Sequence, residues 1–258
     1  MRRSEIIRGE VRKDASRRVY GDDEYRVAVL LKNVTTAYPR SKDPALKNVS
    51  ISIKKGSLSL VTGPNGAGKT TLLELILGFL RPLSGTVRVL GLEMPKHARK
   101  VRLMSSYLMQ DFMKPPTETY TVKQVVSMGL AAFKGPVRPL SEREKELIKR
   151  AIKMVGLEGL EEKPIGILSG GQQQRAFLAR VIVRQPKLIL LDEPFSSLDR
   201  EGRMEISMLI NDIRKHLNST VIVVSHDISP IIDYVDKVIE MKDGCVVSEN
   251  DLHDSSIY

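Results

Sequence analysis

The stretch GPNGAGKTT at residues 63–71 constrains this chain more than any other. It follows an apolar run at 58–61 that predicts a buried strand, and it precedes LLELIL at 72–77, which predicts a helix. Its glycines let the backbone curl with the N–H groups pointing inward, where side chains would otherwise fill the hollow. Because the helix adds the positive end of its dipole, we expect a di- or triphosphate as the ligand.

The spacing of this stretch is G-x-x-x-x-G-K-[ST], in which the lysine and the hydroxyl residue have separate tasks. Lys69 can reach the terminal phosphates, and the Thr70 hydroxyl can hold a magnesium ion. A glycine-rich turn that binds nothing is the alternative, but the strand, the helix and the lysine together disfavour it. The residues expected to contact the nucleotide here are Gly63, Pro64, Asn65, Gly66, Ala67, Gly68, Lys69, Thr70 and Thr71.

Composition limits the classes of protein that this chain can represent. Its 258 residues are enough for one sizeable domain or two small ones, and contents of 41% hydrophobic and 28% charged residues are typical of a soluble globular protein. A single cysteine, Cys245, excludes an internal disulfide and a cysteine-rich metal site. No run approaches the roughly 18 apolar residues of a membrane span, and the N-terminus lacks the apolar core of a secretory signal.

The net charge of +10 admits a nucleic acid, an anionic membrane surface or merely a basic solvated exterior. The basic residues are spread along the chain without a long lysine–arginine run, and only 5% of residues are aromatic and able to stack on bases. A membrane surface attracts each nearby Lys or Arg by about 1 kcal/mol, which suits a peripheral membrane protein. The charge alone does not decide among these, and we expect no nucleic-acid partner.

Hydrophobic periodicity divides the chain into a charged N-terminal extension, residues 1–26, and a folded domain, residues 27–258. Strands are expected at 27–34, 49–53, 58–61, 86–90, 103–109, 188–191 and 220–224, with residues 54–56 closing a hairpin between the second and third strands. Helices are expected near 201–216 and 230–234, before a terminal hairpin around 243–244. A helical insertion is expected at about 111–170, with helices at 121–129 and, after a Ser141–Glu144 capping box, up to residue 155. Strands that alternate with helices predict an α/β sheet.

A second group of polar residues is expected where these strands end. Asp192 and Glu193 follow the apolar strand 188–191, at the edge where open α/β sheets bind ligands. An aspartate there can hold magnesium through water, and a glutamate beside it can polarise the water that attacks the γ-phosphorus. Gln110 and His226 also end strands, and His226 should lie at the same sheet edge; alone, each would be an ordinary structural residue.

The segment LSGGQQQR at 168–175 predicts a second anion-binding turn, because a serine hydroxyl and helix N-terminal amides lie together there. With this segment the chain resembles the nucleotide-binding subunits of ATP-binding cassette (ABC) transporters, from about residue 27 to residue 247. The motifs that support the resemblance are the phosphate loop 63–71, Gln110, the signature 168–175, Asp192–Glu193, Ser197–Leu198–Asp199 in the D-loop position, and His226.

The resemblance implies a RecA-like P-loop NTPase core, with an N-terminal antiparallel β subdomain and an inserted helical signature subdomain. It implies ATP as the substrate and Mg²⁺ as the cofactor, with Thr70, Gln110 and Asp192 as magnesium ligands. Glu193 would be the general base, and His226 would hold the γ-phosphate and the attacking water. Gln110 would sense the nucleotide and link it to the helical subdomain.

The resemblance also implies a partner and a contact to the base. Tyr38 matches the aromatic residue that stacks on adenine, a contact of about 0.5–1.5 kcal/mol beyond burial. Two cassettes would pair head to tail, so that the signature turn of one subunit caps the γ-phosphate held by Lys69 of the other. The residues expected in that second half of the site are Ser169, Gly170, Gly171, Gln172 and Asp199.

In function, the resemblance implies the ATPase of an importer at the cytoplasmic face of the cell membrane. Separate transmembrane permease subunits would dock on a groove within residues 111–128, and an extracellular solute-binding protein would deliver the cargo. Residues 121–129 and 164–169 resemble the zinc/manganese importer ATPases, while iron-chelate and cobalamin importers have similar sequences there. A soluble ABC ATPase such as an assembly factor is the alternative from another class.

Overall fold

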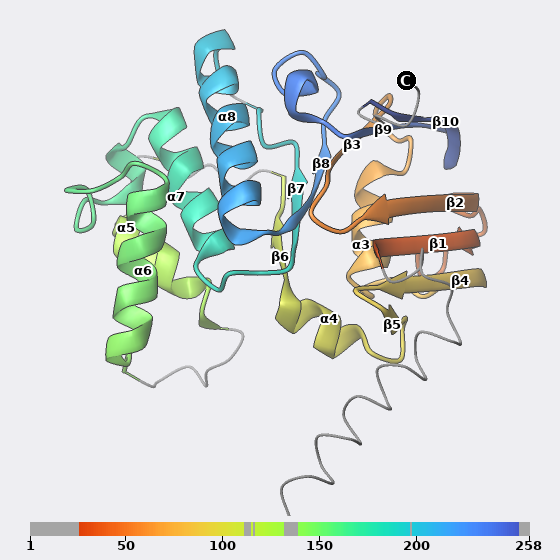
Figure 1. Ribbon diagram of the computed structural model, residues 1–258, viewed down its shortest axis with the longest axis horizontal. Coiled ribbons are helices and arrows are strands. Elements are labelled where there is room, and N and C mark those ends of the chain that lie inside the picture. Colours follow the sequence, from red (N-terminus) through yellow and green to blue (C-terminus); the bar gives the residue numbers. More distant parts are fainter. Residues whose placement is uncertain (1–25, 111–114, 116, 132–138, 197, 253–258) are drawn as a thin grey trace, which may run out of the picture.

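The computed structural model describes residues 26–110, 115, 117–131, 139–196 and 198–252. Nearly all of the expected N-terminal extension therefore lies outside the described residues, and a domain boundary at residue 27 stays a prediction. The described chain forms an antiparallel sheet, a mainly parallel sheet and a group of helices beyond the parallel sheet (Figure 1). None of the helices in this part of the chain is both long and apolar enough to cross a membrane.

The antiparallel sheet has the strand order β2-β1-β4-β5. Its strands are β1 (Val27–Thr36), β2 (Leu46–Lys54), β4 (Ser84–Val89) and β5 (Leu92–Glu93). The second sheet has the order β10-β9-β3-β8-β7-β6, and only β10 runs antiparallel to its neighbour. Its strands are β3 (Leu58–Thr62), β6 (Ser105–Leu108), β7 (Leu188–Asp192), β8 (Thr220–Val224), β9 (Lys237–Lys242) and β10 (Cys245–Asp251).

The hairpin expected at residues 54–56 is wrong, because β2 pairs with β1 and not with β3. The alternating exposure along β2 suits an antiparallel sheet with one solvated face. In contrast, β3 is buried at four of its five positions, as expected of a central strand, and it pairs in parallel with β8 and β9. Residues 54–56 therefore connect one sheet to the other, with Gly56 at a φ of 74°.

The strand expected at 103–109 is also partly wrong. Helix α4 (Ala98–Met104) takes its first two residues, and the strand β6 begins at Ser105. Short apolar runs fit a helix and a strand equally well, so periodicity could not locate this boundary. The helix expected near 230–234 is a single 3₁₀ turn, η3 (Ile232–Tyr234).

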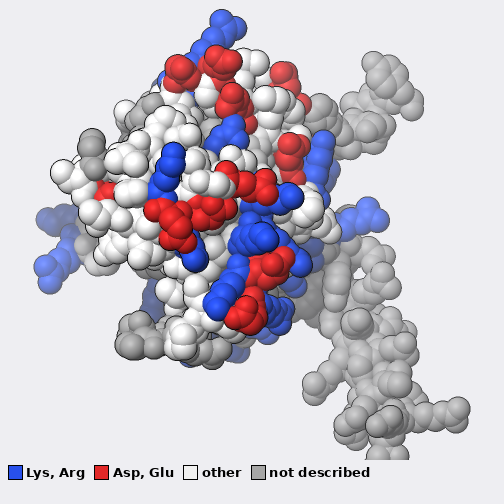
Figure 2. All heavy atoms as spheres, turned by 90° about the vertical axis from the view of Figure 1, so that its left-hand side faces the viewer, with Lys and Arg blue, Asp and Glu red and all other residues white. Residues whose placement is uncertain are grey.

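A group of helices lies at the left of Figure 1, in and just after the range expected for the helical insertion, whose bounds of about 111–170 stay a prediction. It contains α5 (Val122–Met128), α6 (Glu142–Met154), the 3₁₀ turn η2 (Ile165–Ile167) and α7 (Gly170–Ile182). Ser141 and Glu144 form the expected capping box of α6, and Thr121 and Gln124 form another at α5. The outer face of the insertion carries both signs of charge, interspersed (Figure 2).

The core lies on both faces of the parallel sheet, because neighbouring residues of its central strands enter different clusters. In β7, Ile189 and Leu191 pack with the helical insertion and α8 (Arg200–Leu217), while Leu188 and Leu190 pack with α3 (Lys69–Ile76) and the antiparallel sheet. Each fully buried side chain of this kind contributes about 1.5–3 kcal/mol. This two-sided burial fixes the sheet, so that the ends of β3, β7 and β8 meet at one edge.

Candidate nucleotide-binding site

A hollow of about 450 Å³ lies at that edge of the parallel sheet. It collects residues that are far apart in the sequence: the loop before α3, the loop after β1, the end of β6 and the end of β7. The residues that line it are Tyr38, Ala45, Asn65, Gly66, Gly68, Lys69, Thr70, Thr71, Gln110, Asp192 and Glu193. Except for Ala45, all of them are site residues expected from the sequence.

The loop that forms the floor of the hollow needs glycine for two different reasons. A Cβ at Gly63 would collide with the carbonyl oxygen of Met241 in β9, so this glycine is required by packing. A Cβ at Gly66 would meet nothing within 4 Å, so it would project into open space beside the hollow. Gly66 and Gly68 have φ values of 80° and 97°, which favour glycine.

The start of α3 is suited to an anion. Its N-cap is Gly68, and no side chain caps the helix there. The first-turn amides and the positive end of the helix dipole therefore stay available to a phosphate. The Lys69 ammonium donates to the carbonyl oxygens of Gly63 (2.8 Å) and Pro64 (3.0 Å), and no carboxylate of the described residues pairs with it. A phosphate can replace those two neutral acceptors.

Asp192 has a geometry that suits a magnesium ion. Its Oδ2 accepts a hydrogen bond from Thr70 Oγ1 (2.8 Å) and another from the Tyr107 hydroxyl (3.2 Å). Its Oδ1 is buried and lacks a hydrogen-bond partner among the described residues. Burial raises the pKa of Asp192, against the lowering effect of the two hydrogen bonds. A buried carboxylate oxygen without a partner, next to a hydroxyl and the Gln110 amide, matches the oxygen ligands of Mg²⁺.

Glu193 and His226 form a pair at the same edge. Glu193 Oε2 and His226 Nδ1 lie 2.9 Å apart, and since a carboxylate only accepts, the imidazole N–H donates. Glu193 has a φ of 49°, in the left-handed region that is unfavourable for a residue with a side chain. Its N–H continues the ladder to the carbonyl of Val224 in β8 (2.9 Å), which holds the backbone in this conformation. Such strain is concentrated at functional sites.

Tyr38 lies at the rim of the hollow and is 41% exposed. Its hydroxyl donates to Glu74 Oε2 (2.7 Å) and lies 3.1 Å from Thr71 Oγ1. Sequence reasoning found Tyr38 but missed Glu74 and Tyr107, which both touch expected site residues. Tyr107 could have been found from its place near the carboxyl end of β6, whereas Glu74 sits in α3 without any such signal.

The signature turn is well formed but lies outside the hollow. Ser169 caps α7, because its Oγ accepts from Gln172 N (3.3 Å) and its own N–H donates to Gln172 Oε1 (3.1 Å). Asp199 caps α8 through Gly202 N (2.8 Å). Ser197 of the expected D-loop lies outside the described residues. Within one chain, the residues expected to come from a partner subunit do not lie at the phosphate loop. Those that do not line the hollow are Ser169, Gly170, Gly171, Gln172 and Asp199.

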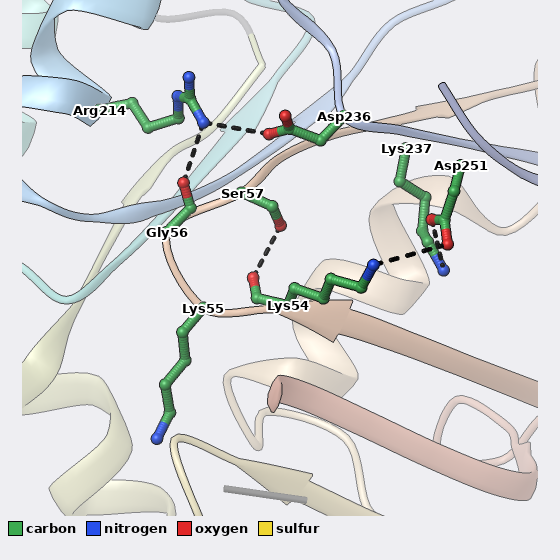
Figure 3. Close-up of a pocket in the computed structure, with 8 residues that line it drawn as sticks. All are labelled: Lys54, Lys55, Gly56, Ser57, Arg214, Asp236, Lys237 and Asp251. Atoms are coloured by element: carbon green, nitrogen blue, oxygen red, sulfur yellow. Dashed lines mark hydrogen bonds and ion pairs between the residues drawn. The ribbon is translucent and has the colours of Figure 1, made fainter. Parts of the chain in front are cut away.

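A second hollow, of about 240 Å³, contains more cations but is a poorer site (Figure 3). Arg214 pairs with Asp236 at 3.0 Å, and Lys237 pairs with Asp251 at 3.2 Å. Asp236 also accepts the N–H of Leu58 at the start of β3 (2.7 Å). These carboxylates pair with Arg214 and Lys237, and Asp236 also holds the start of β3, so we interpret the second hollow as structural.

Comparison with known families and proteins agrees with this geometry. The chain matches the family described as "ABC transporter" over residues 46–196. The zinc transport system ATP-binding protein TroB of Treponema pallidum is 38% identical over 226 residues, which are 86% of this chain and 82% of TroB. The zinc uptake system ATP-binding protein ZurA of Listeria innocua is 34% identical over 211 residues, which are 80% of this chain and 79% of ZurA.

Solved structures give the same result. The protein cbiO1 of Clostridium perfringens, part of the ABC transporter complex cbiONQ, superposes with a TM-score of 0.76 at 33% identity, over 88% of this chain and 89% of cbiO1. A bacterial ABC transporter cassette solved as a dimer superposes with a TM-score of 0.73 at 31% identity, over 87% of this chain and 98% of that cassette.

Proposed function

This chain belongs to the ABC transporter family and is an ATPase, and from that premise we propose that it is the energy-coupling subunit of an importer. It works at the cytoplasmic face of a membrane with separate permease subunits, and its ATP hydrolysis drives uptake of a metal ion of the zinc or manganese type. The main support is one hollow that combines a phosphate loop, a buried aspartate with a free oxygen, and a glutamate that His226 contacts from beside the hollow.

In this proposal the phosphate loop binds ATP because its lysine exchanges hydrogen bonds to backbone carbonyls for bonds to phosphate. Lys69 releases the carbonyls of Gly63 and Pro64 and binds the terminal phosphates, while the first-turn amides of α3 bind the others. Thr70, Gln110 and Asp192 hold Mg²⁺, which when bound neutralises charge that develops on the phosphate oxygens. Tyr38 stacks on the adenine from the rim.

Glu193 acts as the general base. Its carboxylate takes a proton from the attacking water, whose oxygen bonds to the γ-phosphorus while the bond to the bridging oxygen breaks, which gives ADP and phosphate. The His226 Nδ1 contact at 2.9 Å orients this carboxylate, and Nε2 can donate to the γ-phosphate when the imidazole carries both of its protons.

The other half of the site comes from a second copy of the chain. Support comes from the signature turn, which is preformed but lies outside the hollow of its own chain, and from the dimeric state of the similar cassette. We propose that Ser169 to Gln172 of the second copy face the γ-phosphate, with Asp199 beside them. The amides of this helix start would stabilise charge that builds up during hydrolysis.

A third hollow, of about 230 Å³, suits the docking of a permease. It lies between the core helices and the insertion, and it presents the apolar side chains of Phe79 and Met128, in residues that are 58% and 41% exposed. Of the groove expected at 111–128, only Met128 lines it, and residues 111–114 and 116 lie outside the described residues. Tyr107 lines this hollow and also donates to Asp192, so it connects the permease surface with the ATP site.

The proposed cargo rests on the names of relatives. TroB and ZurA are named as ATP-binding proteins of zinc transport and zinc uptake systems, but the Fe(3+) ions import ATP-binding protein FbpC of Vibrio cholerae is also 34% identical, over 85% of this chain and 60% of FbpC. The competing functions are those that the sequence left open, an iron-chelate or cobalamin importer and a soluble assembly factor. Delivery of the cargo by an extracellular solute-binding protein is part of the same proposal.

The test is uptake by cells that lack the gene and are complemented with the wild-type chain or with Glu193→Gln. We expect wild-type cells to accumulate radioactive Zn²⁺ or Mn²⁺, the Glu193→Gln cells to fail, and the chain to sediment with membranes. If the cells instead took up an iron chelate or cobalamin, the chain would serve an importer of that cargo and not of zinc or manganese. A chain that stays in the soluble fraction and supports no uptake would contradict the importer function.

A further inference from the structure

The rim of the nucleotide hollow contains a hydrogen-bond network that the proposed chemistry does not use. The Tyr38 hydroxyl donates to Glu74 Oε2 at 2.7 Å and lies 3.1 Å from Thr71 Oγ1. Thr71 and Glu74 stand three residues apart on α3, so they present their side chains on the same side of that helix. Tyr38 itself comes from the loop after β1. The network therefore ties a loop to the helix that binds the phosphates.

We propose that Glu74 is a positioning residue, whose carboxylate holds the Tyr38 ring against α3 so that the base of the nucleotide meets a ring already in place. The inference rests on the proposed nucleotide site and extends it, because Glu74 itself does not line the hollow. It acts on the ligand through Tyr38.

The loop itself gives the ring little other support. Residues 38–43 are all exposed, and Tyr38 is 41% exposed. A hydrogen bond to a charged carboxylate is roughly twice as strong as a neutral one, so the Glu74 contact is the stronger of the two contacts to α3. Burial raises the pKa of Tyr38, the Thr71 contact lowers it and Glu74 raises it again, and the net rise keeps the hydroxyl a donor.

The geometry indicates what the network does for nucleotide binding. Lys69, Thr70 and Thr71 begin α3, and Glu74 lies in its next turn, so one rigid helix sets both the phosphate position and the ring position. A free side chain must lose rotamer freedom when it stacks, and a ring that is held beforehand loses less. Glu74 thus improves the affinity for the base and leaves the affinity for the phosphates unchanged.

A direct effect of the Glu74 charge is the competing explanation, and it predicts the opposite sign. A carboxylate near a polyphosphate repels it, so removal of the charge would tighten the binding of any polyphosphate. Substitution by glutamine separates the two explanations, because the amide oxygen still accepts from Tyr38 but has no charge.

The experiment measures the dissociation constants of ATP and of inorganic tripolyphosphate, which lacks a base, by calorimetry at equal salt. All variants are made in the hydrolysis-deficient Glu193→Gln chain, and their melting temperatures are compared. We expect Glu74→Ala and Tyr38→Phe each to weaken ATP binding about five- to tenfold, and the double variant to be no weaker than either. Tripolyphosphate binding should not change, and Glu74→Gln, which keeps a neutral acceptor for Tyr38, should bind ATP more tightly than Glu74→Ala and less tightly than the parent.

Three results would overturn the inference. Glu74→Ala could bind ATP as tightly as the parent or more tightly, the two single losses could add in the double variant, or tripolyphosphate binding could change along with ATP binding. Failure of the proposed nucleotide site itself would look different, because the parent chain would then bind neither ATP nor tripolyphosphate.

Discussion

The two hollows at opposite ends of β3 differ in the polar groups that are available to bind a ligand. Where β3 begins, the second hollow holds Arg214 and Lys237, each paired with a carboxylate, at 3.0 and 3.2 Å. Where β3 ends, the nucleotide hollow holds the single cation Lys69, which bonds only neutral carbonyls, and an aspartate with a buried free oxygen. The number of charges in a hollow does not make it a binding site. A binding site needs polar groups that are still able to form hydrogen bonds or ion pairs with a ligand.

The position of each hollow along the sheet explains the difference. Parallel strands direct their carboxyl ends, and the helix starts that follow, to one edge, so the nucleotide hollow receives amides and polar side chains from several segments. At the other edge the chain enters the strands, and Asp236 accepts the N–H of Leu58 where no strand partner does. At that edge, the charged side chains of Asp236 and Arg214 form hydrogen bonds with backbone groups of the protein itself.

The largest expected effect concerns the chemistry of the nucleotide hollow. Glu193→Gln should lower the rate of ATP hydrolysis about a thousandfold, because the amide cannot accept a proton from water. The affinity for ATP should stay within about twofold, since the amide oxygen still accepts from His226. Phosphate release and calorimetry measure the two effects separately. A variant that hydrolyses ATP at the wild-type rate would remove Glu193 from the role of base.

The next effect concerns binding. Lys69→Ala should weaken ATP binding about a hundredfold, because the charge-assisted hydrogen bonds of its ammonium to phosphate are lost. The matched control is Lys54→Ala in the second hollow, where the lysine faces Asp251 at 3.9 Å. This control should bind ATP like the wild-type chain. If Lys54→Ala weakened ATP binding as much as Lys69→Ala does, the contrast between the hollows would be wrong.

The two glycines of the phosphate loop should separate stability from binding. Gly63→Ala should lower the free energy of unfolding by about 3 kcal/mol, because its Cβ meets the Met241 carbonyl. Gly66→Ala should cost about 1 kcal/mol for its positive φ, since its Cβ has open space. It should nevertheless lower ATP affinity. Urea unfolding and calorimetry test both variants, and equal losses of stability would contradict the account of Gly63.

The second hollow should affect only stability. Asp236→Ala removes the acceptor of Leu58 N and of Arg214, and it should lower the free energy of unfolding by about 1–3 kcal/mol. ATP affinity should not change, because β3 remains paired on both sides along its length. Urea unfolding with and without ATP measures this. A specific loss of ATP binding, at unchanged stability, would show that the second hollow is functional after all.

The sequence predicted the nucleotide hollow better than it predicted the fold around it. Lys69 follows the spacing of a phosphate loop, Asp192 and Glu193 follow an apolar strand, and Gln110 was expected from the resemblance to ABC cassettes. All four line the hollow. The pairing of β2 was missed, because residues 54–56 look like a hairpin turn and only the burial of both strands shows that they lie in different sheets.

The residues around the site could not be read from the sequence for a related reason. Tyr107 and Glu74 belong to ordinary secondary structure, and their importance comes only from a hydroxyl 3.2 Å from Asp192 and a carboxylate 2.7 Å from Tyr38. Contacts across elements have no fixed sequence spacing, so only the place of Tyr107 near the end of β6 hinted at its contact, and nothing in the sequence marked Glu74. The signature turn shows the converse, because its pattern is plain and the phosphate that we propose it faces lies in a second copy of the chain.

That missing partner is the central claim, and mixing two inactive chains tests it most directly. Gly171→Glu places a carboxylate at a helix position where a Cβ meets nothing within 4 Å, so the chain should fold, but the charge should repel the partner's γ-phosphate. Lys69→Ala and Gly171→Glu should each be inactive alone. Mixed in equal amounts, they should recover about a quarter of the wild-type ATPase rate, because random pairing makes one complete site in half of the dimers. Full activity of Gly171→Glu alone, or no recovery on mixing, would contradict a site shared by two copies.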